Sequence, residues 1–186
     1  MIPISHWAQV ESRLVLAMVF AFSAATKVFP AGGYASFRKS FAELSGPLGR
    51  WTAGHRGDRA LPAAVPAAEA LLVAGLLAPA GSDLALAAAF VLLLAFSAAL
   101  AGALRRGSTV SCNCFGAGHA PVGRAQLARN ALLMATAGTG LAGSLGDSGA
   151  RPIGVPALLV GVLAATAPAW IAAFWDDLAD LLATPG

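Results

Sequence analysis

Long apolar stretches constrain the fold of this chain more than any other feature. A helix that crosses the hydrocarbon core of a bilayer needs about 20 mostly apolar residues, and candidate spans lie at residues 13–30, 62–79, 84–104, 126–145 and 152–175. Only 11% of the 186 residues are charged and 58% are hydrophobic, whereas a soluble domain carries about 25% charged residues. The pattern predicts an all-α integral membrane protein, with residues 1–186 forming a single compact bundle of four to five transmembrane helices.

The longest connection, residues 31–61, contains an amphipathic segment at about residues 35–45. Phe37, Phe41 and Leu44 follow one another at helical spacing, while Arg38 and Lys39 fall on other faces. This pattern is typical of a short helix that lies in the membrane interface.

Small residues are frequent in the apolar stretches and are densest at residues 138–143, which read Gly-Thr-Gly-Leu-Ala-Gly. In lipid, small side chains let helix backbones approach closely, and packing rather than hydrophobicity drives the association of helices. We therefore expect closely packed helices.

Five spans alternate in direction, so polar residues from several spans should meet on one side of the membrane. They lie at the end of the first span, in the first turns of the second and fourth, and just after the third. The residues concerned are Lys27, Glu69, Arg105, Arg106, Arg129 and Asn130.

Lys27 and Glu69 should lie at similar depth in the membrane. Because ionisable side chains inside a bilayer are costly and normally paired, we predict that the two interact. The alternative is a lysine that extends its ammonium group to the interface and a separate interfacial glutamate.

The two cysteines of the chain are separated by a single residue, in the sequence Cys112-Asn-Cys114. A disulfide between them would close a small, strained ring, and strained disulfides tend to be catalytic or labile. Cationic neighbours lower the pKa of a thiol and raise its reactive thiolate fraction. Arg105, Arg106 and Arg129 would supply that positive charge, so the pattern favours thiol–disulfide exchange or electron transfer.

Phe115 and Gly116 follow the second cysteine directly. They would give an apolar cover and a flexible turn beside this sulfur, which favours Cys112 as the exposed attacking thiol and Cys114 as its resolving partner.

Other functions remain open for the same cysteines. Cys112, Cys114 and His119 form a C-x-C-x4-H set that suits a soft metal such as Cu(I) or Zn(II), and His55 would add a fourth ligand. A further alternative is a non-catalytic membrane assembly factor, in which the cysteines are inert buried thiols.

A known family shares several of these motifs in the same order. They are Arg13 and Lys27 around the first span, Pro66-Ala-Ala-Glu69 in the second, Arg106-Gly107 after the third, residues 112–116 (Cys-Asn-Cys-Phe-Gly), and Arg129-Asn130 in the fourth. With these residues the chain resembles the methylamine-utilisation membrane protein family MauE, a relative of the DoxX-like membrane proteins, from about residue 13 to residue 145.

The resemblance implies a polytopic membrane protein linked to thiol–disulfide chemistry. MauE-like proteins are associated with maturation of a disulfide-rich methylamine dehydrogenase beside a thioredoxin-like partner, so the resemblance implies a thioredoxin-like or other thiol protein as partner. It leaves open whether methylamine metabolism is involved here, and whether a quinone or a metal binds.

The basic residues also predict an orientation. The net charge of +3 does not indicate nucleic-acid binding, because the lysines and arginines form no dense run. Cytoplasmic loops of membrane proteins carry an excess of lysine and arginine, which places the cysteine connection of this multi-pass cell-membrane protein close to the cytoplasm. Disulfides persist mainly outside the cytoplasm, so this placement favours a cysteine pair embedded in the bundle.

Overall fold

Helices make up the chain throughout the residues that the computed structural model describes, which are 4–29, 31–53, 57–78, 81–107, 123–146 and 155–175. These residues form six α-helices and no strand, which confirms the predicted all-helical class. The helices are α1 (Ile4–Val28), α2 (Gly33–Ala53), α3 (Gly57–Leu77), α4 (Ser82–Arg105), α5 (Arg124–Gly146) and α6 (Val155–Ala173).

A helix coincides with each of the five predicted spans, namely α1, α3, α4, α5 and α6. Among the described residues, two segments are long and apolar enough to cross a bilayer, namely His6–Val28 in α1 and Ser82–Arg105 in α4. Shorter apolar segments occupy Leu61–Leu77 of α3 and Leu159–Ala173 of α6. The all-helical class is thus established, while the count of four to five spans stays a prediction.

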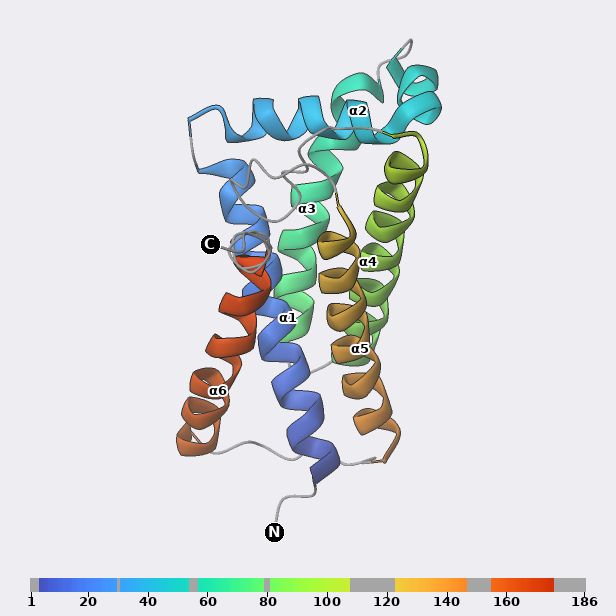
Figure 1. Ribbon diagram of the computed structural model, residues 1–186. Helices are drawn as coiled ribbons and strands as arrows, with labels where there is room; N and C mark the ends of the chain where they lie inside the picture. The colour runs from blue at the N-terminus through green and yellow to red at the C-terminus, as the bar shows by residue number, and fades with distance from the viewer. Residues whose placement is uncertain are drawn as a thin grey trace, which may run out of the picture.

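Helix α1 is the centre of the packing (Figure 1). It contacts α3, α5 and α6 extensively, and α4 packs against α5 and α3. The buried apolar side chains of α1 include Leu16, Val19 and Phe20, each at most 2% exposed.

The start of α1 differs from the prediction, because the helix begins at Ile4 and passes through Arg13. The prediction starts the first span at about Arg13. Its guanidinium instead donates hydrogen bonds from Nε to the carbonyl oxygen of Leu76 (2.7 Å) and from Nη2 to that of Ala78 (2.6 Å). The last carbonyls of a helix lack partners within the helix, so Arg13 caps α3 from inside the bundle.

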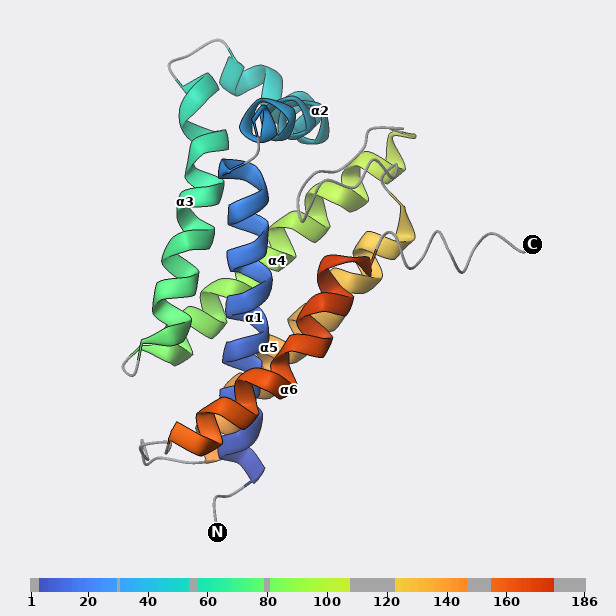
Figure 2. The same cartoon turned by 90° about the vertical axis from the view of Figure 1, so that its left-hand side faces the viewer.

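Helix α2 lies across the end of the bundle where α1 ends and α3 begins, as two views at right angles show (Figures 1 and 2). Gly32, with φ of +85°, allows the turn between α1 and α2. Phe37, Ser40 and Leu44 are buried while Arg38 and Lys39 are exposed. The predicted amphipathic segment is therefore a helix, but it extends over Gly33–Ala53 rather than residues 35–45.

Small residues permit two close helix contacts. A Cβ atom on Gly140 of α5 would lie 2.8 Å from the Cβ of Ser12 in α1, and a Cβ on Gly75 of α3 would lie 3.1 Å from that of Ala85 in α4. The hydroxyls of Ser12 and Thr139 lie 3.3 Å apart at the same crossing. Within the predicted small-residue cluster, Gly140 thus makes the close approach, whereas Gly138 meets nothing within 4 Å.

The outer surface of the bundle is strongly apolar. Large aliphatic side chains are exposed along α3, α4, α5 and α6, including Leu71, Leu84, Val91, Leu132, Leu163 and Ile171. Extended exposed apolar surfaces are unusual in soluble monomers and mark contact with a membrane or a partner. A lipid bilayer is the environment that fits this surface.

Candidate functional site at the α2 end of the bundle

Several helix termini meet at one end of the bundle, which we call the α2 end. It comprises the C-termini of α1 and α4, the N-termini of α3 and α5, and α2 lying across them (Figure 1). Of the predicted site residues, those that the structure describes come from these helices: Lys27, Glu69, Arg105, Arg106, Arg129 and Asn130.

The connection between α4 and α5 carries the other predicted site residues. Cys112, Cys114, Phe115, Gly116 and His119 all lie outside the described residues, as does His55 between α2 and α3.

Lys27 and Glu69 form a buried ion pair between α1 and α3. Lys27 Nζ lies 2.9 Å from Glu69 Oε1 and 3.0 Å from Oε2, and the two side chains are 1% and 0% exposed. Removing charges from water is expensive, and the cost is repaid only where the geometry is good and further hydrogen bonds are made. The predicted contact between these two residues is confirmed.

Ser23 and Phe37 also contact this pair. Lys27 Nζ donates to the hydroxyl of Ser23 (2.6 Å) and to its carbonyl oxygen (3.2 Å), and the Ser23 hydroxyl donates to Glu69 Oε1 (2.9 Å). The Lys27 ammonium also lies 5.2 Å from the centre of the Phe37 ring, within the range of a cation–π contact. These contacts join α1, α2 and α3 at one point.

Neither Ser23 nor the Phe37 contact was predicted from the sequence. The spacing could have indicated the Ser23–Lys27 contact, because Ser23 stands four residues before Lys27 and residues at this spacing are neighbours on a helix. The Phe37 contact depends on how α2 crosses the bundle, which no local pattern specifies.

The two arginines at the end of α4 are both exposed, but they differ in their contacts. Arg106 donates a hydrogen bond from Nη2 to the carbonyl oxygen of Leu44 (2.8 Å), which links α4 to α2. Arg105 is exposed beside it. Both stand before the cysteine segment (residues 108–122) in the chain, so they place positive charge at the end of α4 that precedes it.

Arg129 and Asn130 are almost fully buried in α5, at 2% and 0% exposure. The Asn130 amide donates from Nδ2 to the hydroxyl of Ser97 in α4 (3.3 Å), and that hydroxyl donates to the carbonyl oxygen of Leu93 (2.8 Å). The other amide atom, Asn130 Oδ1, accepts no hydrogen bond from the residues that the structure describes. Asn130 therefore links α5 to α4 through a polar contact.

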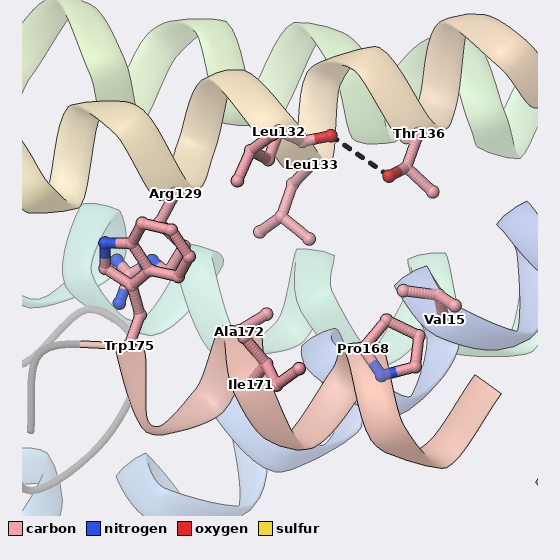
Figure 3. Close-up of a pocket in the computed structure, with 9 residues that line it drawn as sticks. All are labelled: Val15, Arg129, Leu132, Leu133, Thr136, Pro168, Ile171, Ala172 and Trp175. Carbon is pink, nitrogen blue, oxygen red and sulfur yellow. Dashed lines mark hydrogen bonds between the residues drawn. The ribbon is translucent and has the colours of Figure 1, made fainter. Parts of the chain in front are cut away.

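Arg129 reaches into a pocket bordered by α1, α5 and α6 (Figure 3). The pocket has a volume of about 160 Å³. Arg129 and Trp175 lie at the same end of it, and the remaining walls are mainly aliphatic. Neither this pocket nor Trp175 was predicted from the sequence, because both depend on how α6 packs against α1 and α5.

A metal site has no support among the described residues, which contain no group of three or more histidine, cysteine or acidic side chains placed to hold an ion. The alternative set of Cys112, Cys114 and His119 lies outside them.

The buried ion pair, the apolar exterior and the two long apolar helices define a helical membrane protein with an ionic network at one end. The family described as methylamine utilisation protein MauE matches residues 5–143, and the chain belongs to this family. The family comprises membrane proteins involved in methylamine utilisation. No curated protein and no solved structure matches the chain.

Proposed function

We propose that this protein is a membrane-embedded thiol–disulfide oxidoreductase, or electron relay, that acts through Cys112 and Cys114. The observation that carries the proposal is that arginines stand on both sides of a C-x-C sequence along the chain. Arg105 and Arg106 stand at the end of α4, before this sequence in the chain, and Arg129 is buried in α5, which follows it. Positive charge at these positions favours the thiolate form, which is the reactive form of cysteine.

The exchange reaction uses both cysteines in turn. The Cys112 thiolate attacks a disulfide of a partner protein, which forms a mixed disulfide and releases one partner thiolate. Cys114 then attacks the sulfur of Cys112, which frees the second partner thiol and leaves a Cys112–Cys114 disulfide. The same steps in reverse order oxidise a partner dithiol. A disulfide between residues two apart closes a small, strained ring, and strained disulfides are stronger oxidants, which favours this direction.

The ionic network supports this role by holding the surrounding helices. Lys27 and Glu69 join α1 to α3, and Arg106 joins α4 to α2. The Arg106 contact thus holds the end of α4, which precedes the cysteines in the chain, against α2. Phe115 and Gly116 would then shape the surroundings of the second sulfur.

The proposed partner is a thioredoxin-like or other thiol protein, in keeping with a role in the maturation of another protein. We place the protein in the cell membrane as a multi-pass protein with its cysteine segment near the cytoplasmic face. Membership of the MauE family supports methylamine utilisation as the setting.

The redox state of the cysteine pair in cells tests the proposal. Free thiols are alkylated with a reagent that adds mass, with and without prior reduction, and the shift is read on a gel. We expect a reductant-sensitive disulfide in the unchanged chain and its loss, together with activity, in Cys112→Ser and in Cys114→Ser. Ser111→Ala, next to the pair, serves as the control and should retain both.

Three results would contradict the proposal. The first is a pair that never forms a disulfide. The second is stoichiometric bound metal that is lost in His119→Ala, which would indicate the soft-metal site. The third is normal function in the double serine variant, which would indicate an assembly factor with incidental cysteines.

A further inference from the structure

The pocket between α5 and α6 is not explained by thiol exchange with a protein partner. Most of its lining is aliphatic, with Leu132, Leu133, Pro168 and Ala172 among the walls. Its volume of about 160 Å³ is close to that of an engineered apolar cavity, about 150 Å³, that binds benzene. The space therefore suits one six-membered ring.

The polar groups at one end of the pocket are hydrogen-bond donors. The Arg129 guanidinium carries five N–H groups and no acceptor, and the indole Nε1 of Trp175 is a buried donor with no hydrogen-bond partner among the described residues. The third polar side chain, Thr136, donates its own hydroxyl proton to the carbonyl oxygen of Leu132 (3.0 Å). A ring that fits this end should carry an acceptor oxygen.

The pocket opens on the apolar outer surface of the bundle. Leu132 and Ile171 belong to its lining and are 56% and 48% exposed. Exposed apolar residues continue along α6 through Leu163 and Val160. A ligand with a long hydrocarbon tail could enter from the bilayer and leave its tail along this surface.

We infer that the pocket binds the ring of an isoprenoid quinone, with a ring carbonyl accepting hydrogen bonds from Arg129 and Trp175. A phospholipid headgroup is the less suitable occupant, because a phosphate with its glycerol is not a flat ring and because Arg129 is the one cation among the described residues that line the pocket. The positive guanidinium would also stabilise the negative oxygen that develops as a quinone is reduced.

A quinone bound in this pocket accepts electrons from the cysteine pair, and this part of the inference rests on the proposed function. Cys112 and Cys114 together lose two electrons and two protons as their disulfide forms. The quinone takes up both electrons and both protons and becomes a hydroquinone, so the exchange is balanced. Arg129 lies five residues after the start of α5 at Arg124, a rise of about 7.5 Å along the helix, on the helix that directly follows the cysteine segment.

Binding is measured first, on the purified full chain in quinone-free nanodiscs, by titration with a decyl-substituted benzoquinone. Quenching of tryptophan fluorescence and the amount of quinone retained both report binding. We expect saturable binding to the unchanged chain, weakened at least tenfold in Ala172→Phe, which fills the pocket. Ala131→Phe is the matched control, since Ala131 is exposed on α5 and does not line the pocket; it should bind normally.

Further variants test the donors and guard against misfolding. Trp175→Phe keeps an aromatic side chain at this position but removes the N–H group. We expect it to weaken binding about fivefold, as the loss of one hydrogen bond would. Thr136→Phe fills the pocket from a partly exposed position, in case Ala172→Phe fails to fold. Equal affinity in the filled and unchanged chains would overturn the inference, as would retention of a phospholipid in place of the quinone.

A separate measurement distinguishes this inference from the proposed function. Quinone binding should persist in the Cys112→Ser/Cys114→Ser variant, whereas dithiol-driven reduction of the quinone should be lost. If the unchanged chain forms its disulfide with diamide but never reduces the quinone, the acceptor role fails and the proposed function stands. If the quinone binds but no oxidant forms the disulfide, the proposed function fails and the binding site stands.

Discussion

At the scale of single residues, the Lys27–Glu69 pair is the most constrained polar feature of the described structure. Both side chains are essentially inaccessible, and Ser23 satisfies further hydrogen-bonding capacity of each. An ionised group left alone in such a place is far more costly than the intact pair. We therefore expect the removal of one member to destabilise the protein, because the other charge stays buried without a partner.

The first prediction concerns this pair. Lys27→Met should lower the free energy of unfolding by about 3–5 kcal/mol, because it leaves the Glu69 carboxylate buried without its partner. The double variant Lys27→Met/Glu69→Leu should recover most of that loss, since two apolar side chains leave no buried charge. Chemical unfolding in mixed micelles, followed by circular dichroism, measures both.

Lys39→Met provides the control, because Lys39 is an exposed lysine on α2. It should change the free energy of unfolding by less than about 0.5 kcal/mol. An unchanged stability in Lys27→Met would contradict the account of a tightly coupled pair, and so would a double variant no more stable than the single one.

At the scale of helices, close approach of α1 and α5 depends on one glycine. The crossing brings the Gly140 backbone against Ser12, so close that a methyl group on Gly140 would lie 2.8 Å from the Ser12 Cβ. Helices in lipid associate through such contacts. The crossing also holds the helix that carries Arg129 and Asn130 against the central helix.

The second prediction tests this crossing. Gly140→Ala should destabilise the protein by about 1–3 kcal/mol, because overpacking forces the two helices apart. Gly138→Ala is the matched control two residues earlier, where nothing lies within 4 Å. It should leave stability unchanged or raise it slightly, since alanine is the better helix former.

Thermal unfolding in the same detergent compares the two variants. Ser12→Gly combined with Gly140→Ala should restore part of the stability, because it removes the Ser12 side chain that the new methyl group would meet and leaves only Leu86 Cδ1, 3.1 Å away. Equal unfolding temperatures for Gly138→Ala and Gly140→Ala would show that the crossing tolerates a larger separation.

The helices themselves were largely predictable from hydropathy, and their contacts were not. Apolar stretches located α3, α4, α5 and α6 to within a few residues, and depth along two antiparallel spans predicted the Lys27–Glu69 contact. The predicted start of α1 was wrong, because the helix begins at Ile4 and Arg13 lies within it, where it caps the end of α3. The roles of Phe37 and Trp175 arise from packing between segments that are distant in sequence, and a local sequence pattern does not predict such packing.

At the scale of the whole molecule, the direction in which the chain crosses the membrane follows from two features. Alternating helices place the α2 end opposite the N-terminus of α1 (Figure 1). Most of the basic residues belong to α2, to the ends of α3, α4 and α5 on the α2 side, or to the sequence between α2 and α3. In chain order they are Arg38, Lys39, Arg50, Arg56, Arg59, Arg105, Arg106 and Arg124.

The third prediction is therefore an N-terminus outside the cell and a C-terminus in the cytoplasm. Basic connections are retained on the cytoplasmic side, and an odd number of spans puts the two termini on opposite sides. Reporters active on only one side of the membrane, fused in turn to the N-terminus, to the C-terminus and at the Gly81 turn between α3 and α4, measure this. With five spans, the Gly81 reporter should share the side of the N-terminus.

The same reporters separate five spans from two. If only the long apolar segments of α1 and α4 crossed the bilayer, both termini would lie on one side and the Gly81 turn on the other. Termini on the same side would thus contradict the five-span arrangement, and an outward C-terminus with an inward N-terminus would reverse its orientation. The orientation matters for the chemistry, because it decides whether a thiol partner approaches Cys112 and Cys114 from the cytoplasm. A quinone bound among α1, α5 and α6 would enter its pocket from the bilayer in either orientation.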